Sequence, residues 1–174
     1  MADWSTLYMK EVALSDAALA PIGLGAFSTA MMIGRIFGDK GRAVLGDARL
    51  MIINSLVAMT GAVLLIAFPT PIIVILALFL IGLGLSVIVP IAYSTAGAAE
   101  GLAPGVGISM VTTIGYAGFL FGPPIIGFLA DWQTLRIAMF FVAFLFLLMT
   151  GLTILHSSLS QNKDIAHRDT ETRR

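Results

Sequence analysis

Cysteine is absent from this chain of 174 residues, which rules out disulfide bonds, thiolate metal ligands and a cysteine nucleophile. Charge is scarce as well: charged residues make up 11% of the chain, against about 25% in a soluble domain. The ten basic and ten acidic side chains cancel, so no overall positive field attracts nucleic acid. Only two histidines are present, His156 and His167, and both lie near the C-terminal end. These shortages argue against a soluble enzyme, a nucleic-acid-binding protein and an internal metal site.

Motifs of known catalytic sites are also missing. The sequence contains no Ser-His-Asp set within reach, no paired-histidine zinc motif and no Gly-Lys-Ser/Thr phosphate loop. Glu100 is separated from any acid or base partner. We therefore expect no catalytic residue, no metal ion and no cofactor, and we predict that the protein is not an enzyme.

The sequence is rich in apolar residues, which make up 58% of the chain, and the mean hydropathy of the chain is +0.97. Between residues 50 and 130 the only charged side chain is Glu100. A helix that crosses the bilayer needs about 20 apolar residues, and this stretch has room for several. The composition therefore predicts an all-α integral membrane protein whose surroundings are the lipid bilayer.

Polar and proline-containing turns divide residues 17–156 into five predicted spanning helices. Pro69 and Pro71, for example, force a turn because proline cannot continue a helix interior. The segment 1–16 precedes the helices, and the polar residues 157–174 are expected to form a solvated tail. The five predicted helices cover approximately residues 17–38, 50–68, 72–94, 105–130 and 137–155.

Lysine and arginine predict the orientation, because cytoplasmic loops are enriched in them. Eight of the ten basic residues lie around the first connection or in the tail. Four crossings separate these two regions, so they share a side of the membrane. We therefore expect residues 1–16 in the periplasm and the C-terminal tail in the cytoplasm.

Residues 32–42 close the first predicted helix and contain Asp39 followed by Lys40. This segment resembles the loop motif of the major facilitator superfamily, in which a glycine precedes an Asp–Arg/Lys pair and further glycine and basic residues follow. Here Gly34 stands five residues before Asp39, and Arg42 occupies the place of the second glycine. Residues 3–8 are similar to the outer end of the seventh helix of a bacterial inner-membrane subgroup of that superfamily, and residues 115–131 are similar to its eleventh helix.

The resemblance implies a fold and a function. The five predicted helices would be helices eight to twelve of a twelve-helix secondary transporter of small solutes in the bacterial inner membrane. The chain would then be a truncated or split C-terminal portion. It would pair with a separately encoded N-terminal half, associate with itself, or be an inactive remnant. A non-transporting membrane interaction or packing subunit is the other interpretation, and the substrate is left open.

The resemblance also implies a gating role for the residues of the loop motif. Asp39 would contact a helix N-terminus or an arginine across the cytoplasmic face, where a carboxylate is favourable. The alternative is that these charges only set the topology and end the helix. The candidates for this role are Gly34, Arg35, Gly38, Asp39 and Lys40.

A solute cavity is implied between the first, third and fourth predicted helices, which correspond to cavity-lining helices of the family. Hydroxyl side chains there can hydrogen-bond a neutral polar solute, although each can instead bond to a carbonyl of its own helix. No ionisable side chain lies at mid-depth in the spans, so we expect no proton relay within this chain. The cavity candidates are Ser28, Thr29, Ser86, Tyr93, Thr112, Thr113 and Tyr116.

The fourth predicted helix is rich in glycine and contains two adjacent prolines in mid-span. The prolines remove two backbone donors and predict a bend. A bent, glycine-rich helix suits gating, and a static bend is the alternative. Glycines four residues apart also favour close helix contact. The candidates for a kink or gate are Gly118, Gly122, Pro123 and Pro124.

Overall fold

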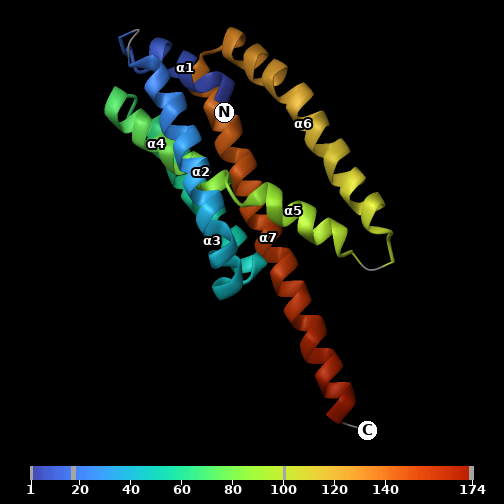
Figure 1. Cartoon of the computed structure of the whole chain (residues 1–174). Helices are drawn as coiled ribbons and strands as arrows, with labels where there is room; N and C mark the ends of the chain where they lie inside the picture. Colours follow the sequence, from blue (N-terminus) through green and yellow to red (C-terminus); the bar gives the residue numbers. More distant parts are fainter. Residues whose placement is uncertain (1, 17–18, 100, 173–174) are drawn as a thin grey trace.

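The computed structural model describes residues 2–16, 19–99 and 101–172, and it is built from helices (Figure 1). Five helical stretches are long and apolar enough to cross a membrane, with α4 and α5 together forming the third, Pro71–Gly97. This confirms the predicted all-α architecture with five spans. The helices within the described residues are α1 (Ala2–Glu11), α2 (Ala20–Leu45), α3 (Asp47–Ala67), α4 (Pro71–Leu85), α5 (Ile88–Gly97), α6 (Pro104–Trp132) and α7 (Leu135–Thr172).

α2, α3, α4 and α7 form a packed bundle with α1 docked against α2, whereas α5 and α6 depart from it (Figure 1). α4 packs against both α2 and α3, and α3 packs against α7. α5 turns away from α4 and leads to α6, which contacts α5 and α7. Of the described residues of α6 only Gly107 and Ile126 are buried. α6 is therefore the span with the least support from the rest of the chain.

Small residues bring the bundle helices close together, as lipid-embedded helices require. A Cβ added to Gly61 would lie 2.7 Å from the carbonyl oxygen of Ala77, and one added to Gly82 would meet the carbonyl of Phe27. Ala58 and Ala77 are fully buried. α4 can therefore lie tightly between α2 and α3 only because these positions lack side-chain bulk.

The C-terminal end of α3 is held by polar groups from two other helices. The Tyr8 hydroxyl donates to the Leu65 carbonyl at 2.7 Å, and the Arg136 Nη2 donates to the Ile66 carbonyl at 2.7 Å. The last carbonyls of a helix have no partner within it, so these bonds satisfy groups that would otherwise be unpaired. Burial raises the pKa of Tyr8 to about 12, and the nearby charge of Arg136 opposes the shift. Residues 2–11, predicted as a periplasmic segment, thus form a short docked helix.

Two helices extend further than the sequence predicts. α2 continues to Leu45 instead of ending near residue 38, because residues 39–45 contain no proline. It stops at Gly46, whose φ of 76° is a conformation that glycine adopts readily. The loop motif therefore lies on a helix. α7 continues to Thr172 through the predicted tail, which contains neither proline nor glycine.

The third predicted helix is divided at Ser86 and Val87 into α4 and α5. Pro90 has no backbone N–H, so the Ser86 carbonyl loses its usual partner four residues later. The Ser86 N–H and hydroxyl both bond to the Leu83 carbonyl, at 3.3 and 2.6 Å. The helix closes locally at this point, and α5 starts in a new direction (Figure 1).

Candidate functional site

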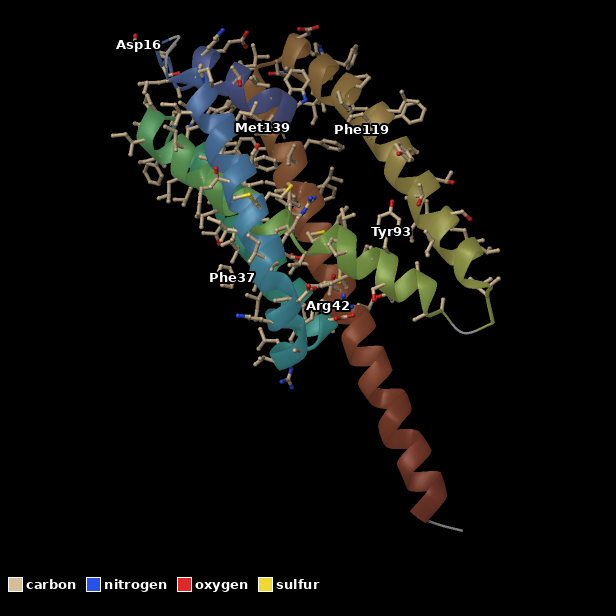
Figure 2. All side chains as sticks on the ribbon, viewed as in Figure 1. Asp16, Phe37, Arg42, Tyr93, Phe119 and Met139 are labelled. Atoms are coloured by element: carbon tan, nitrogen blue, oxygen red, sulfur yellow. The ribbon has the colours of Figure 1, made fainter. Side chains whose placement is uncertain are left out.

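A pocket of about 290 Å³ lies between α5 and α6. Three of the predicted cavity residues, Tyr93, Thr112 and Tyr116, line it together. Figure 2 shows the Tyr93 side chain rising from α5 toward α6. The complete lining is Val89, Tyr93, Thr112, Gly115, Tyr116 and Phe119.

Helical spacing explains why these residues converge. Thr112, Tyr116 and Phe119 are four and three residues apart, which places them on one face of α6. Val89 and Tyr93 are four apart on α5 in the same way. The pocket is thus a property of two facing helix surfaces.

One hydrogen bond crosses the pocket. The Tyr93 and Thr112 hydroxyl oxygens are 3.3 Å apart, and Thr112 also donates to the Ile108 carbonyl of its own helix at 2.8 Å. Tyr93 is half-buried, whereas Tyr116 is 70% exposed. The lining therefore has the hydrogen-bonded hydroxyls of Tyr93 and Thr112 on one side and the exposed ring of Tyr116 on the other.

Charge is missing from the pocket lining. Within the described parts of α5 and α6 the only charged side chain is Asp131, at the far end of α6 from Thr112. The described residues also contain no group of three or more His, Cys, Asp or Glu able to hold a metal ion. The pocket lining offers hydroxyl groups and apolar surface for binding.

The structure does not bring the other cavity candidates into this pocket. Ser28 and Thr29 lie exposed on α2, and Thr113 bonds to the Ser109 carbonyl of its own helix. Ser86 is fully buried at the break between α4 and α5. The resemblance selects these residues only by the helix on which they lie. The position of each side chain around its helix decides which of them meet.

Two of the loop-motif candidates are packing residues at the same break. A Cβ added to Gly34 would collide with the Ser86 side chain, and one added to Gly38 would lie 2.8 Å from Cγ1 of Val87. Their spacing of four places both on the side of α2 that faces the break. This geometry agrees with the interpretation that Gly34 and Gly38, four residues apart, allow close contact between helices.

The charged loop-motif candidates have a different environment. Arg35, Asp39 and Lys40 are exposed on α2. The Arg35 Nη2 lies 3.6 Å from the sulfur of Met31, one turn earlier on the same helix. These three side chains point out of the bundle and are open to another surface.

Arg42 makes polar contacts that its place in the sequence does not predict. Its Nε and Nη2 each donate to a carboxylate oxygen of Asp47 at 2.8 Å, and Nη2 also donates to the Ser94 hydroxyl at 3.0 Å. These bonds join the end of α2, the start of α3 and the end of α5. Nothing in the local sequence around Ser94 signals a partner 52 residues away.

α6 passes through Pro123 and Pro124 without a break. No heavy atom of the described residues lies within 4 Å of a Cβ added to Gly118 or Gly122. The face of α6 that carries these two residues, its open glycine face, is therefore not used for packing by the described part of the chain. The bend stays a prediction.

Comparison with known proteins places the chain in a family. No family model and no solved structure matches it. An uncharacterized MFS-type transporter of Yersinia pestis is 33% identical over 84% of the chain, and the membrane protein MosC of Rhizobium meliloti is 34% identical over 82%. An uncharacterized transporter of Sinorhizobium fredii is 31% identical over 80%. The chain spans between 35% and 38% of the length of these relatives. With this similarity and its five apolar spans, the chain belongs to the major facilitator superfamily.

Proposed function

We propose that the chain forms helices eight to twelve of a secondary transporter of small solutes in the bacterial inner membrane. Relatives named as transporters support this role, and so does the set of five spans. The observation that carries the proposal is the meeting of Tyr93, Thr112 and Tyr116 in one pocket. Secondary transporters bind their solutes near the membrane midplane, at broken helices. The break before α5 gives the pocket such a helix, and the proposal includes no enzymatic activity.

The proposed orientation places residues 2–16 in the periplasm and the C-terminal end of α7 in the cytoplasm. The exposed charges of Arg35, Asp39 and Lys40 then lie toward the cytoplasmic end of α2. There they can contact the other half of a transporter and hold one conformation closed. α6 would move with its Gly118–Pro124 region as the flexible part of the gate.

A transporter of this kind rocks two halves around a central site. The exposed side of α6 is where we expect the remaining helices to pack, from a separately encoded half or from a second copy. The same open glycine face also suits a non-transporting packing subunit, which is the second candidate function. An inactive remnant would keep the fold of these helices but show no solute movement.

The test uses inner-membrane vesicles that contain the chain together with the portion of the Yersinia pestis relative outside the match. The vesicles are loaded with a mixture of neutral and charged small solutes, and release of each solute is followed by mass spectrometry. We expect faster release of at least one solute than from vesicles without the chain. Gly115→Leu, which fills the pocket, should abolish the difference, and Thr113→Val should not. Equal release of every solute, with both parts present in the membrane, would favour the packing subunit or the inactive remnant.

A further inference from the structure

We infer that the pocket between α5 and α6 binds uncharged organic molecules that combine an aromatic body with a hydrogen-bond donor such as a hydroxyl. The inference rests on the proposed function, since it names the class of solute that the same site would accept. Three independent features of the pocket lead to it.

The first feature is the absence of a charge that could pair with an ionic solute. Burying an ion in an apolar site is unfavourable unless an opposite charge accompanies it. Arg42 reaches α5 at Ser94, but its charge is already paired with the carboxylate of Asp47 and it does not line the pocket. Neither an anion nor a cation therefore finds a counter-charge on the pocket lining.

The second feature is the shape and surface of the pocket. Val89, Phe119 and the rings of Tyr93 and Tyr116 provide an apolar and largely aromatic lining. Aromatic side chains pack favourably against other rings in offset or edge-to-face arrangements. The volume of about 290 Å³ is at the lower end of ligand pockets, which range from about 300 to 1,000 Å³. One or two fused rings match this space.

The third feature is the direction of the hydrogen bonds. The Ile108 carbonyl can only accept, so the single Thr112 hydroxyl hydrogen goes to it at 2.8 Å. Because one hydroxyl donates only one hydrogen bond, we assign the donor in the 3.3 Å contact between the two hydroxyl oxygens to Tyr93. The lone pairs of the Tyr93 oxygen remain available to accept. A solute that donates a hydrogen bond therefore matches the site better than one that only accepts.

The experiment measures binding of tritiated 2-naphthol to the full chain in lipid nanodiscs by a scintillation proximity assay, with empty nanodiscs as the baseline. Three naphthalene derivatives compete with it. 2-Methoxynaphthalene is uncharged but has no donor, 2-naphthoate is an anion, and 2-naphthylmethylammonium is a cation at neutral pH. We expect 2-methoxynaphthalene to bind about three- to tenfold more weakly than 2-naphthol, which is the effect of one hydrogen bond. We expect the two ions to compete least.

Matched variants show whether binding occurs in this pocket. Gly115→Leu places a side chain in the pocket and should remove the chain-dependent binding. Ala117→Leu is the matched control on α6, because residues two apart on a helix do not face the same way, and it should not remove the binding. Gly115 has open space beyond it and Ala117 is exposed, so both variants are compatible with the fold. Tyr93→Phe keeps the ring and should make 2-naphthol and 2-methoxynaphthalene equal. Thr113→Val is the control for loss of a hydroxyl outside the pocket.

The outcomes separate this inference from the proposed function. One outcome would be that an ion binds as tightly as 2-naphthol and loses its binding equally in Gly115→Leu. That outcome would overturn the inference that the solute is uncharged, but it would still leave a transporter with a working site. Absence of any binding that responds to Gly115→Leu, in a chain that remains folded by thermal unfolding, would also overturn the inference. The vesicle release experiment decides the transporter role separately.

Discussion

Arg42 connects three helix ends through one planar side chain. A lysine keeps the charge but cannot present two parallel donors to a carboxylate. We expect Arg42→Lys to keep the contact with Asp47 in part and to lose the contact with Ser94. Amide hydrogen exchange at the C-terminal end of α5 should then rise several-fold, while exchange within α4 stays the same.

Arg49 offers a control for that experiment, because it is exposed and lies only a few residues further along the chain. Arg49→Lys should leave the exchange of α5 unchanged. Equal exchange in the Arg42 and Arg49 variants would show that Arg42 does not hold α5.

Tyr8 predicts a dependence of stability on alkaline pH. Its pKa is about 12 in the folded chain, above the ordinary value of 10.0. Between these two values the folded chain keeps a proton that the unfolded chain releases, so the free energy of unfolding falls as the pH rises. Tyr8→Phe removes this contribution and should flatten the decrease between pH 10 and 12.

The measurement is the thermal unfolding midpoint of the detergent-solubilised chain over that pH range. Tyr116→Phe is the control, since Tyr116 is largely exposed and lies in the open pocket. If the unfolding midpoints of the wild type and the Tyr8→Phe variant fell equally with pH, the result would contradict the buried environment of the Tyr8 hydroxyl.

At the scale of helices, apolar length predicts the spans but not their local breaks. The five spans follow from hydropathy, and Pro69 and Pro71 mark one turn correctly. The division at Ser86 does not follow from apolar length, because it depends on the proline at position 90 and on a side chain that bonds back to its own helix. The extension of α2 to Leu45 depends on which glycine adopts a positive φ: Gly41 stays helical, and Gly46 ends the helix.

The same distinction applies to the pocket. Tyr93, Thr112 and Tyr116 could be selected from sequence because the resemblance assigned their helices to a cavity. Ser28, Thr29 and Ser86 were selected on the same ground and lie elsewhere. The rotation of each helix about its axis is set by packing of distant small residues, which no local pattern reveals.

Gly34 tests the packing of α2 against the break. A Cβ there would collide with Ser86, so Gly34→Ala should destabilise the chain by about 1–3 kcal/mol, as overpacking does. Gly25→Ala, on the same helix with open space beyond it, should leave the stability unchanged or raise it slightly. The measurement is the denaturant dependence of unfolding in mixed micelles.

A second substitution makes this prediction specific. Ser86→Gly removes the atoms that the new methyl group would meet, so the double variant should recover most of the loss. Failure of Ser86→Gly to restore stability to Gly34→Ala would contradict direct contact between these positions.

For the whole molecule, the charge distribution predicts a single topology. Reporter fusions after Arg49 and after Arg174 should both give the cytoplasmic signal, and a fusion after Gln133 should give the periplasmic one. The reason is that an even number of crossings separates the first two sites and an odd number separates Gln133 from either of them. A periplasmic signal after Arg49 or Arg174 would contradict the five-span orientation.

The open side of α6 predicts where another polypeptide packs. Gly118→Leu should prevent co-purification with the unmatched portion of the Yersinia pestis relative while leaving the unfolding midpoint of the chain alone unchanged. No atom of the described residues lies within 4 Å of a Cβ at this position, but the new side chain would block close approach of another helix. Gly25→Leu is the matched control on α2, and equal co-purification of both variants would argue against this surface.

The single residue between α2 and α3 has a consequence for biogenesis. With only Gly46 as a linker, the joined ends of the two helices stay close together. We therefore expect these two spans to leave the translocon as a pair, with α4 packing between them afterwards. Arg42 and Asp47 flank the turn and can neutralise each other as soon as it forms. This ion pair would then be in place while the later helices are still being synthesised.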